Sequence, residues 1–227
     1  MAADPASDKP DVEPIRDGVF FTLPAALPRG RHTLPRDQVR EAQRERSLAA
    51  MTELLAGRGY RGFSVDDIAG RAGISLHALY QCFDSKDACV FAGYDRFIEV
   101  LLRSMAELTG EVNDQSTLGS ELVAAYFATL GRDLVVARAY QVEIDALGYE
   151  ARERRRNALT LFAEYIKVRV RALDPELADE LPDETYLGVV YAVRQLASDA
   201  LDKAPQPDFA RLSGRLESWV ADVFRRR

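Results

Sequence analysis

Two cysteines, two histidines and one tryptophan among 227 residues limit the chemistry that this chain can carry. So few cysteines exclude a small scaffold built on disulfides, and no histidine pair stands near Cys82 and Cys89 to complete a zinc site. Both histidines, His32 and His77, precede the long second half, which leaves that half without a base for a serine or cysteine nucleophile. Motifs for phosphate loops, dinucleotides and metalloproteases are missing too. We therefore expect no cofactor, no metal and no enzyme activity.

A long apolar run is also missing, since no stretch approaches the roughly 20 residues that cross a bilayer. Residues 1–11 have neither the basic start nor the apolar stretch of a secretion signal, so a soluble, cytoplasmic protein is expected. The net charge of −6 argues against indiscriminate nucleic-acid binding. It is unevenly spread, however: −3 in residues 1–28, +2 in residues 29–96 and −5 in residues 97–227. Any basic site is therefore expected in the second of these segments.

Proline is concentrated at the start of the chain, where residues 1–28 hold five of the ten prolines and five acidic residues. Proline interrupts helices and sheet ladders, so this segment is predicted to be a mostly disordered acidic tail. Val19, Phe20, Phe21 and Leu23 form one short apolar patch within it. We interpret the patch as chain that rests on the body, with a docking segment as the alternative.

From residue 36 onward, apolar residues recur at helical spacing almost everywhere. Leu48, Met51 and Leu55, for example, mark one face of a first helix. No alternation of polar and apolar residues is long enough for a sheet, and no internal repeat of 20–50 residues is present. The predicted fold is all-α with about nine helices, namely an N-terminal three-helix domain and a larger helical domain.

Residues 64–83 predict two short helices joined by a glycine turn. Ser64 and Asp67 have the spacing of a capping box, Gly73 ends the first helix and Ser75 caps the second. This is the helix-turn-helix pattern, in which the second helix enters the major groove of DNA.

Residues 44–91 resemble the DNA-binding domain of the TetR family of bacterial regulators. The matching residues are Gly59-Tyr60, Ser64-Val65-Asp66-Asp67-Ile68-Ala69, Ala72-Gly73-Ile74-Ser75, Leu79-Tyr80-Gln81-Cys82-Phe83 and Asp84-Ser85-Lys86-Asp87. The resemblance implies a homodimer that binds double-stranded operator DNA and a small-molecule effector. After Ser75 the family often has Lys-Gly-Thr, whereas this chain has Leu76-His77-Ala78, which implies a different operator.

The expected domains are the tail (1–28), a basic arm with the helix-turn-helix domain (29–84) and an effector-binding and dimerisation domain (85–227). The resemblance implies that Ser64, Tyr80 and Lys86 contact phosphates while Leu76, His77 and Gln81 face the bases. The arm can reach an adjacent minor groove, or it is an ordinary charged linker. The full set of expected DNA-binding residues is Arg29, Arg31, Ser64, Ser75, Leu76, His77, Tyr80, Gln81 and Lys86.

The last two long helices are expected to form the dimer interface, because the first of them is apolar nearly all round and must be buried on both sides. The alternative is that both helices are central in the monomer. The expected interface residues are Leu187, Val190, Tyr191, Leu216, Trp219, Val220 and Val223. The expected effector-pocket residues, which could equally be ordinary core residues, are Tyr126, Phe127, Tyr140, Glu143, Phe162, Tyr165 and Tyr191.

Two further features are interpreted as structural. The basic run Arg152–Arg156 is expected to be a solvated helix face, and both cysteines are expected to be packing residues. The predicted function is a TetR-type regulator, a repressor that a small molecule releases from its operator. Two alternatives stay open: a ligand-free regulator controlled by a protein partner, and a helical ligand-binding or scaffold protein without DNA binding.

Overall fold

The computed structural model describes residues 12–25 and 35–225. Over these ranges the chain forms ten α-helices and no named strand, which confirms the all-α class. None of these helices is long and apolar enough to span a membrane. The α-helices are α1 (Arg36–Arg58), α2 (Val65–Ala72), α3 (Leu76–Cys82), α4 (Lys86–Thr109), α5 (Gln115–Gly131), α6 (Leu134–Gln141), α7 (Tyr149–Leu173), α8 (Pro175–Glu180), α9 (Asp183–Lys203) and α10 (Phe209–Val223).

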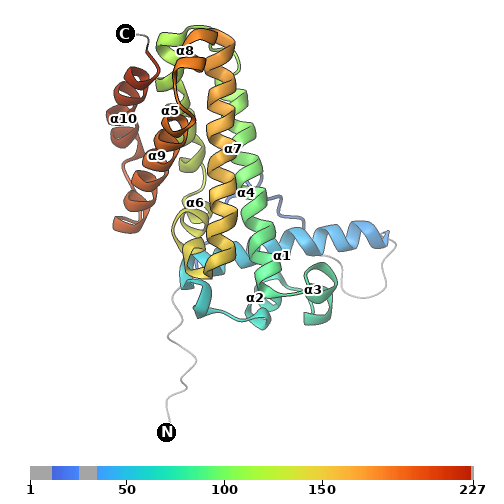
Figure 1. Ribbon diagram of the computed structural model, residues 1–227. Helices are drawn as coiled ribbons and strands as arrows, with labels where there is room; N and C mark the ends of the chain where they lie inside the picture. The colour runs from blue at the N-terminus through green and yellow to red at the C-terminus, as the bar shows by residue number, and fades with distance from the viewer. Residues whose placement is uncertain (1–11, 26–34, 226–227) are drawn as a thin grey trace.

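Figure 1 shows two stacked parts. The small helices α2 and α3 lie with α1 at one end of the molecule, and the long helices α4 and α7 rise away from them. Helices α9 and α10 run along one side of this upper part. Helix α1 packs against α2 and α3 and also against α4 and α6, so it belongs to both parts.

The described residues contain one α-helix more than the expected number of about nine. Helix α6 ends at Gln141, and the chain continues as the 3-10 turn η2 (Glu143–Leu147). The chain after α7 forms an extra short helix, α8, which Asp174 caps and which has Pro175 at its first position. Proline is favourable there because the first turn of a helix needs no backbone N–H donor.

The prediction of a disordered tail is wrong for residues 12–25. Val12, Ile15, Phe20 and Phe21 are all buried, and the ring of Phe20 packs on the ring of Phe97 with 5.5 Å between centroids. The apolar patch therefore rests on the body, as the first interpretation held for Phe20 and Phe21.

The backbone of this N-terminal segment forms hydrogen bonds with side chains of the helical body instead of with a neighbouring strand. The buried Glu53 of α1 accepts a hydrogen bond of 2.9 Å from the backbone N–H of Ile15. Arg71 of α2 donates to the carbonyl oxygen of Val12 at 2.9 Å. An extended chain with four buried apolar side chains and side-chain partners for its backbone needs no regular secondary structure to be ordered.

Candidate DNA-binding surface and ligand cavity

The turn between α2 and α3 is fixed by caps at both helices. Ser64 and Asp67 form the predicted capping box at the start of α2, and the Ser75 side chain accepts a hydrogen bond at the start of α3. Gly73 ends α2 with φ of +66°, a left-handed conformation that favours glycine. From α1, Arg46 Nε donates to the carbonyl oxygen of Ala72 at 2.7 Å, which ties the turn to the first helix.

Helix α3 presents one exposed face. Ala78 and Leu79 are its buried residues, whereas Leu76, His77, Tyr80 and Gln81 are exposed. Leu76 and Tyr80 are large apolar side chains with exposed fractions of 37% and 48%. His77 Nε2 and Gln81 Nε2 lie 3.0 Å apart, so these two polar groups are already adjacent. The predicted base-facing residues therefore share one surface with Tyr80.

Ser64 is on the surface, but its hydroxyl is already engaged. It donates to Asp67 Oδ2 at 2.8 Å and accepts from the Asp67 backbone N–H at 3.2 Å. A phosphate that approaches Ser64 would also meet the negative charge of this carboxylate. Its predicted phosphate contact stays a prediction.

Lys86, the first residue of α4, holds the loop before α2. Its ammonium group donates to the carbonyl oxygens of Tyr60 and Phe63 and lies 4.1 Å and 4.0 Å from the centroids of the same two rings. The next residue, Asp87, accepts a hydrogen bond from the Tyr60 hydroxyl. Burial lowers the pKa of Lys86. Two of the three ammonium protons are thus used within the protein, and at most one is left for the predicted phosphate contact.

A cavity of about 60 Å³ lies among α4, α5, α6, α7, α9 and α10. Most of its wall is aliphatic or aromatic, as with Leu101 and Met105 of α4, Leu122 of α5 and Phe162 of α7, and these side chains are buried. A water molecule needs about 10–15 Å³ by the same measure, so the cavity has room for only a handful of waters. A ligand larger than that must displace part of the wall.

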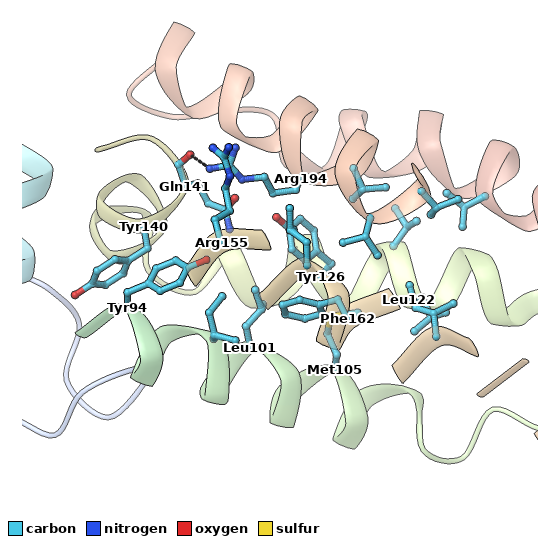
Figure 2. A pocket seen from close by; sticks show the side chains of 18 residues that line it. Tyr94, Leu101, Met105, Leu122, Tyr126, Tyr140, Gln141, Arg155, Phe162 and Arg194 are labelled. Atoms are coloured by element: carbon cyan, nitrogen blue, oxygen red, sulfur yellow. Dashed lines mark hydrogen bonds between the residues drawn. The ribbon is translucent and has the colours of Figure 1, made fainter. Parts of the chain in front are cut away.

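Polar groups gather toward one end of this cavity, as Figure 2 shows. Arg194 of α9 donates to the carbonyl oxygen of Gln141 at 2.8 Å, and both Arg194 and Arg155 of α7 pair with Asp145. Gln141 Oε1 and the Tyr126 hydroxyl are both buried at this end of the cavity, and burial raises the pKa of Tyr126 more than a hydrogen bond with the Gln141 side chain lowers it. Two guanidinium groups against one carboxylate leave this end of the cavity with a local positive charge.

The structure brings together three of the seven predicted pocket residues. Tyr126, Tyr140 and Phe162 line the cavity, and burial raises the pKa of both tyrosines, so their hydroxyls stay protonated. Tyr140 is almost fully buried, and its hydroxyl lies 2.7 Å from Thr52 Oγ1 of α1.

The other four predicted pocket residues lie elsewhere. Phe127 packs on Phe209 with ring centroids 5.3 Å apart, and Tyr165 shares a hydrogen bond of 2.8 Å with Thr109. Glu143 lies in η2, where burial raises its pKa. Tyr191 is exposed on α9. Residue type and approximate position could not separate these residues from the wall, because the direction in which a side chain points depends on how the helices pack.

Arg155 and Arg194 were missed as cavity residues. Arg155 belongs to the run that we interpreted as a solvated face, yet it lines the cavity. The signal was its spacing: Leu159, Phe162 and Ile166 follow it at helical intervals on the face that α7 buries. Arg154, in contrast, pairs with Glu150 and Asp95 at the surface. Arg194 stands alone as a charge within the apolar face of α9, which is the corresponding signal there.

The predicted interface residues divide by exposure into three groups. Val190, Leu216 and Val220 are buried within this one chain, and Val190 and Val220 line the cavity. Leu187 and Val223 are partly buried. Tyr191 and Trp219 are large and apolar, with exposed fractions of 39% and 42%, and Leu196 adds a third such side chain at 39%.

The arm residues Arg29 and Arg31 lie outside the described ranges. Over residues 12–25 and 35–225, no cluster of three or more His, Cys, Asp or Glu side chains could hold a metal ion. Cys89 is buried, and Cys82 is partly buried.

The exposed face of α3 lies at one end of the molecule (Figure 1), and the cavity lies inside the helical body. Residues 48–92 match the family model of bacterial regulatory proteins, tetR family. The similarity to the TetR family is therefore established for the helix-turn-helix segment, and it covers residues 48–92.

Two relatives support the same family. The chain is 35% identical over 121 residues to the HTH-type transcriptional regulator EthR of Mycobacterium tuberculosis, which covers 52% of this chain and 54% of EthR. It is 32% identical over 110 residues to the HTH-type transcriptional activator FasR of Mycolicibacterium smegmatis, 48% of each chain. The chain thus matches about half the length of these relatives.

Solved structures with this fold cover more of the chain. The fatty acid degradation regulator FadR of Bacillus halodurans superposes with a TM-score of 0.69 over 82% of this chain and 97% of its own, at 18% identity. FadR of Bacillus subtilis, solved in complex with stearoyl-CoA, gives 0.68 over 79% and 98%, at 17% identity. At these identities the likeness concerns the fold.

Proposed function

We propose that this protein is a homodimeric transcriptional regulator that binds operator DNA through α3 and responds to an apolar small molecule with an anionic end. It acts without catalysis, in the cytoplasm, as a repressor that its ligand releases. The observation that carries the proposal is the exposed face of Leu76, His77, Tyr80 and Gln81 on a helix fixed by Ser64, Gly73 and Ser75.

Each exposed side chain of α3 has a chemical role on DNA. Gln81 can pair with adenine and Leu76 can contact a thymine methyl group, with His77 beside them. Tyr80 can donate its hydroxyl to a phosphate. Ser64, Ser75 and Lys86 lie at helix N-termini, where backbone N–H groups favour phosphate.

The boundaries follow from the same reasoning. DNA binding belongs to residues 29–84, with Arg29 and Arg31 as a minor-groove arm, and ligand binding and dimerisation belong to residues 85–227. The outer faces of α9 and α10 supply the dimer contact, because Tyr191, Leu196 and Trp219 would otherwise leave three large apolar side chains in water.

The chemistry of the cavity supports one class of effector. Its apolar wall suits a hydrocarbon chain, and the local charge of Arg155, Arg194 and Asp145 suits an anionic group. An acyl chain that ends in a carboxylate, or that is joined through a thioester to an anionic carrier, has both parts. The stearoyl-CoA bound by FadR of Bacillus subtilis has this chemistry.

DNA binding is tested by selecting duplexes from a random library with the wild-type protein and measuring their affinity at several salt concentrations. We expect a two-fold symmetric site and a steep salt dependence. Gln81→Ala should relax the base preference at one position of each half-site, at a cost of about 1–3 kcal/mol. Gln206→Ala, the same change in the exposed turn after α9, is the control and should leave affinity unchanged.

Failure to select any sequence would contradict DNA binding. If such a protein still binds apolar ligands, the helical ligand-binding alternative holds instead.

The effector class is tested with dodecanoate and dodecanol, which share a chain and differ in charge. We expect dodecanoate to bind about tenfold more tightly, because charge-assisted hydrogen bonds to arginine exceed neutral ones. Bound dodecanoate should lower operator affinity by about 5–150-fold, the usual range of allosteric coupling. Equal binding of the two compounds would contradict the anionic end. Binding without any change in operator affinity would favour the ligand-free regulator with a protein partner.

A further inference from the structure

Tyr140 lines the cavity and also contacts α1, the helix on which α2 and α3 pack. It lies in α6, and its side chain is 1% exposed. Its ring stacks on Phe97 with centroids 5.4 Å apart and meets Tyr94 edge-on at 6.1 Å. Figure 2 shows the ring at one end of the cavity, with its hydroxyl directed away from Arg155 and Arg194.

The Tyr140 hydroxyl reaches the first helix. Its oxygen lies 2.7 Å from Thr52 Oγ1, which in turn donates to the carbonyl oxygen of Leu48, also at 2.7 Å. A threonine hydroxyl has one proton, so Tyr140 is the donor in the bond between the two side chains. The bond is buried and joins a cavity wall to the helix on which α2 and α3 pack.

The side chains around the hydrogen bond between Tyr140 and Thr52 are tightly packed. A methyl group added to Gly93 of α4 would lie 2.0 Å from the Tyr140 hydroxyl oxygen and 2.8 Å from the terminal methyl of Met51. Gly93 is therefore the point at which the tyrosine side chain crosses α4 to reach α1. Three helices, α1, α4 and α6, meet at one hydroxyl, and the Tyr140 ring cannot shift without disturbing α1 or α4.

The small volume of the cavity suggests how ligand binding can affect α1. An acyl chain needs far more than about 60 Å³, so its binding must move wall side chains. A ligand biases a two-state protein only through contacts that differ between the states. Displacement of the Tyr140 ring would break its hydrogen bond to Thr52, so this bond can serve as such a contact.

We propose that Tyr140 is a positioning residue through which occupancy of the cavity sets the orientation of α1, and with it the DNA-binding domain. In the empty protein the hydroxyl bond to Thr52 holds α1 in the DNA-binding orientation, and a ligand that displaces the ring releases it. The inference rests on the proposed function for its link to DNA, whereas the coupling between cavity and α1 is a property of the protein alone.

The bond itself is tested by amide hydrogen exchange in peptides that cover residues 47–56. Tyr140→Phe and Thr52→Val keep the shapes of the side chains and remove the bond. Each should speed exchange by about tenfold, and the double variant should add nothing to either single change. Tyr126→Phe is the matched control, since this buried cavity tyrosine belongs to α5 and its hydroxyl makes no hydrogen bond to α1 within the described residues. Wild-type exchange in Tyr140→Phe would overturn the proposal, as would equal acceleration in Tyr126→Phe.

A second measurement separates coupling from a merely structural role and needs no identified ligand. Val193→Phe fills the cavity from α9 and stands in for a bound chain, with Val190→Phe as a replacement if that variant does not fold. The filling should speed exchange in residues 47–56 by about tenfold in the wild-type background and leave Tyr140→Phe unchanged. Equal acceleration in both backgrounds would show another route and overturn the proposal.

The same variants can be measured on the selected operator. A loss of affinity on filling that disappears in Tyr140→Phe supports the proposal. If the protein selects no operator, only the proposed function fails, because the exchange experiment still decides whether Tyr140 couples the cavity to α1.

Discussion

Replacing Phe20 by alanine is expected to lower the free energy of unfolding by about 3–5 kcal/mol, the usual cost of truncating a fully buried phenylalanine. Phe20 is 2% exposed and packs on Phe97, which stacks in turn on Tyr140. The variant loses both the buried area and the packing of that ring cluster. Urea unfolding followed by circular dichroism measures the change.

Leu23→Ala is the control within the same segment. Its side chain is 37% exposed, so its truncation should cost well under 1.5 kcal/mol, the lower end for burying an aliphatic side chain completely. If Phe20→Ala lowers the free energy of unfolding as little as Leu23→Ala does, the N-terminal segment contributes little to the fold. A larger effect of Phe20→Ala would place this segment in the core.

The reason that the sequence pointed to disorder here is physical. Prolines exclude helix and sheet ladders, and acidic residues lower the mean hydropathy, but neither prevents an extended chain from being held by side chains of the body. The acceptor for Ile15 is Glu53 and the donor to Val12 is Arg71, both distant in sequence. Composition within residues 1–28 could not reveal partners that only the folded body supplies.

Introducing a charge at Trp219 is expected to have the largest effect on DNA binding. Trp219→Glu should dissociate the dimer and weaken operator affinity by at least about 100-fold, because a buried unpaired charge and a lost aromatic anchor both disfavour an interface. Two recognition helices must meet two half-sites at once, and a monomer supplies only one. Sedimentation velocity measures the mass, and binding to the selected operator measures the affinity.

Leu161→Glu is the matched control for this change. Leu161 is a large apolar side chain on α7 with 51% exposure, more than Trp219. It should leave both the mass and the operator affinity as in wild type. A dimeric Trp219→Glu protein with full affinity would contradict the assigned interface on α9 and α10.

The recognition helix was predictable from sequence because its determinants are local. Ser64, Gly73 and Ser75 act on residues three or four positions away, and the exposed face of α3 follows from helical spacing. The cavity was less predictable. Tyr126, Tyr140 and Phe162 line it, but Phe127, Tyr165 and Tyr191 point elsewhere, since crossing angles between distant helices decide which aromatic residues meet.

Lys86 was predictable from the sequence only in part. Its place at the start of α4 follows from sequence, as does its proximity to the DNA-binding face. Its hydrogen bonds to the carbonyl oxygens of Tyr60 and Phe63 do not, because they depend on how the loop before α2 folds over α4.

The small volume of the cavity has a consequence for how the proposed response to a ligand can change during evolution. When the conformation that can bind the ligand is rare, the apparent affinity of the protein for that ligand falls in proportion to the population of this conformation. Substitutions in the aliphatic wall that loosen or tighten its packing would therefore move the ligand concentration at which the protein responds. They would do so without altering the groups that recognise the ligand, so sensitivity and selectivity can diverge independently among descendants of this chain.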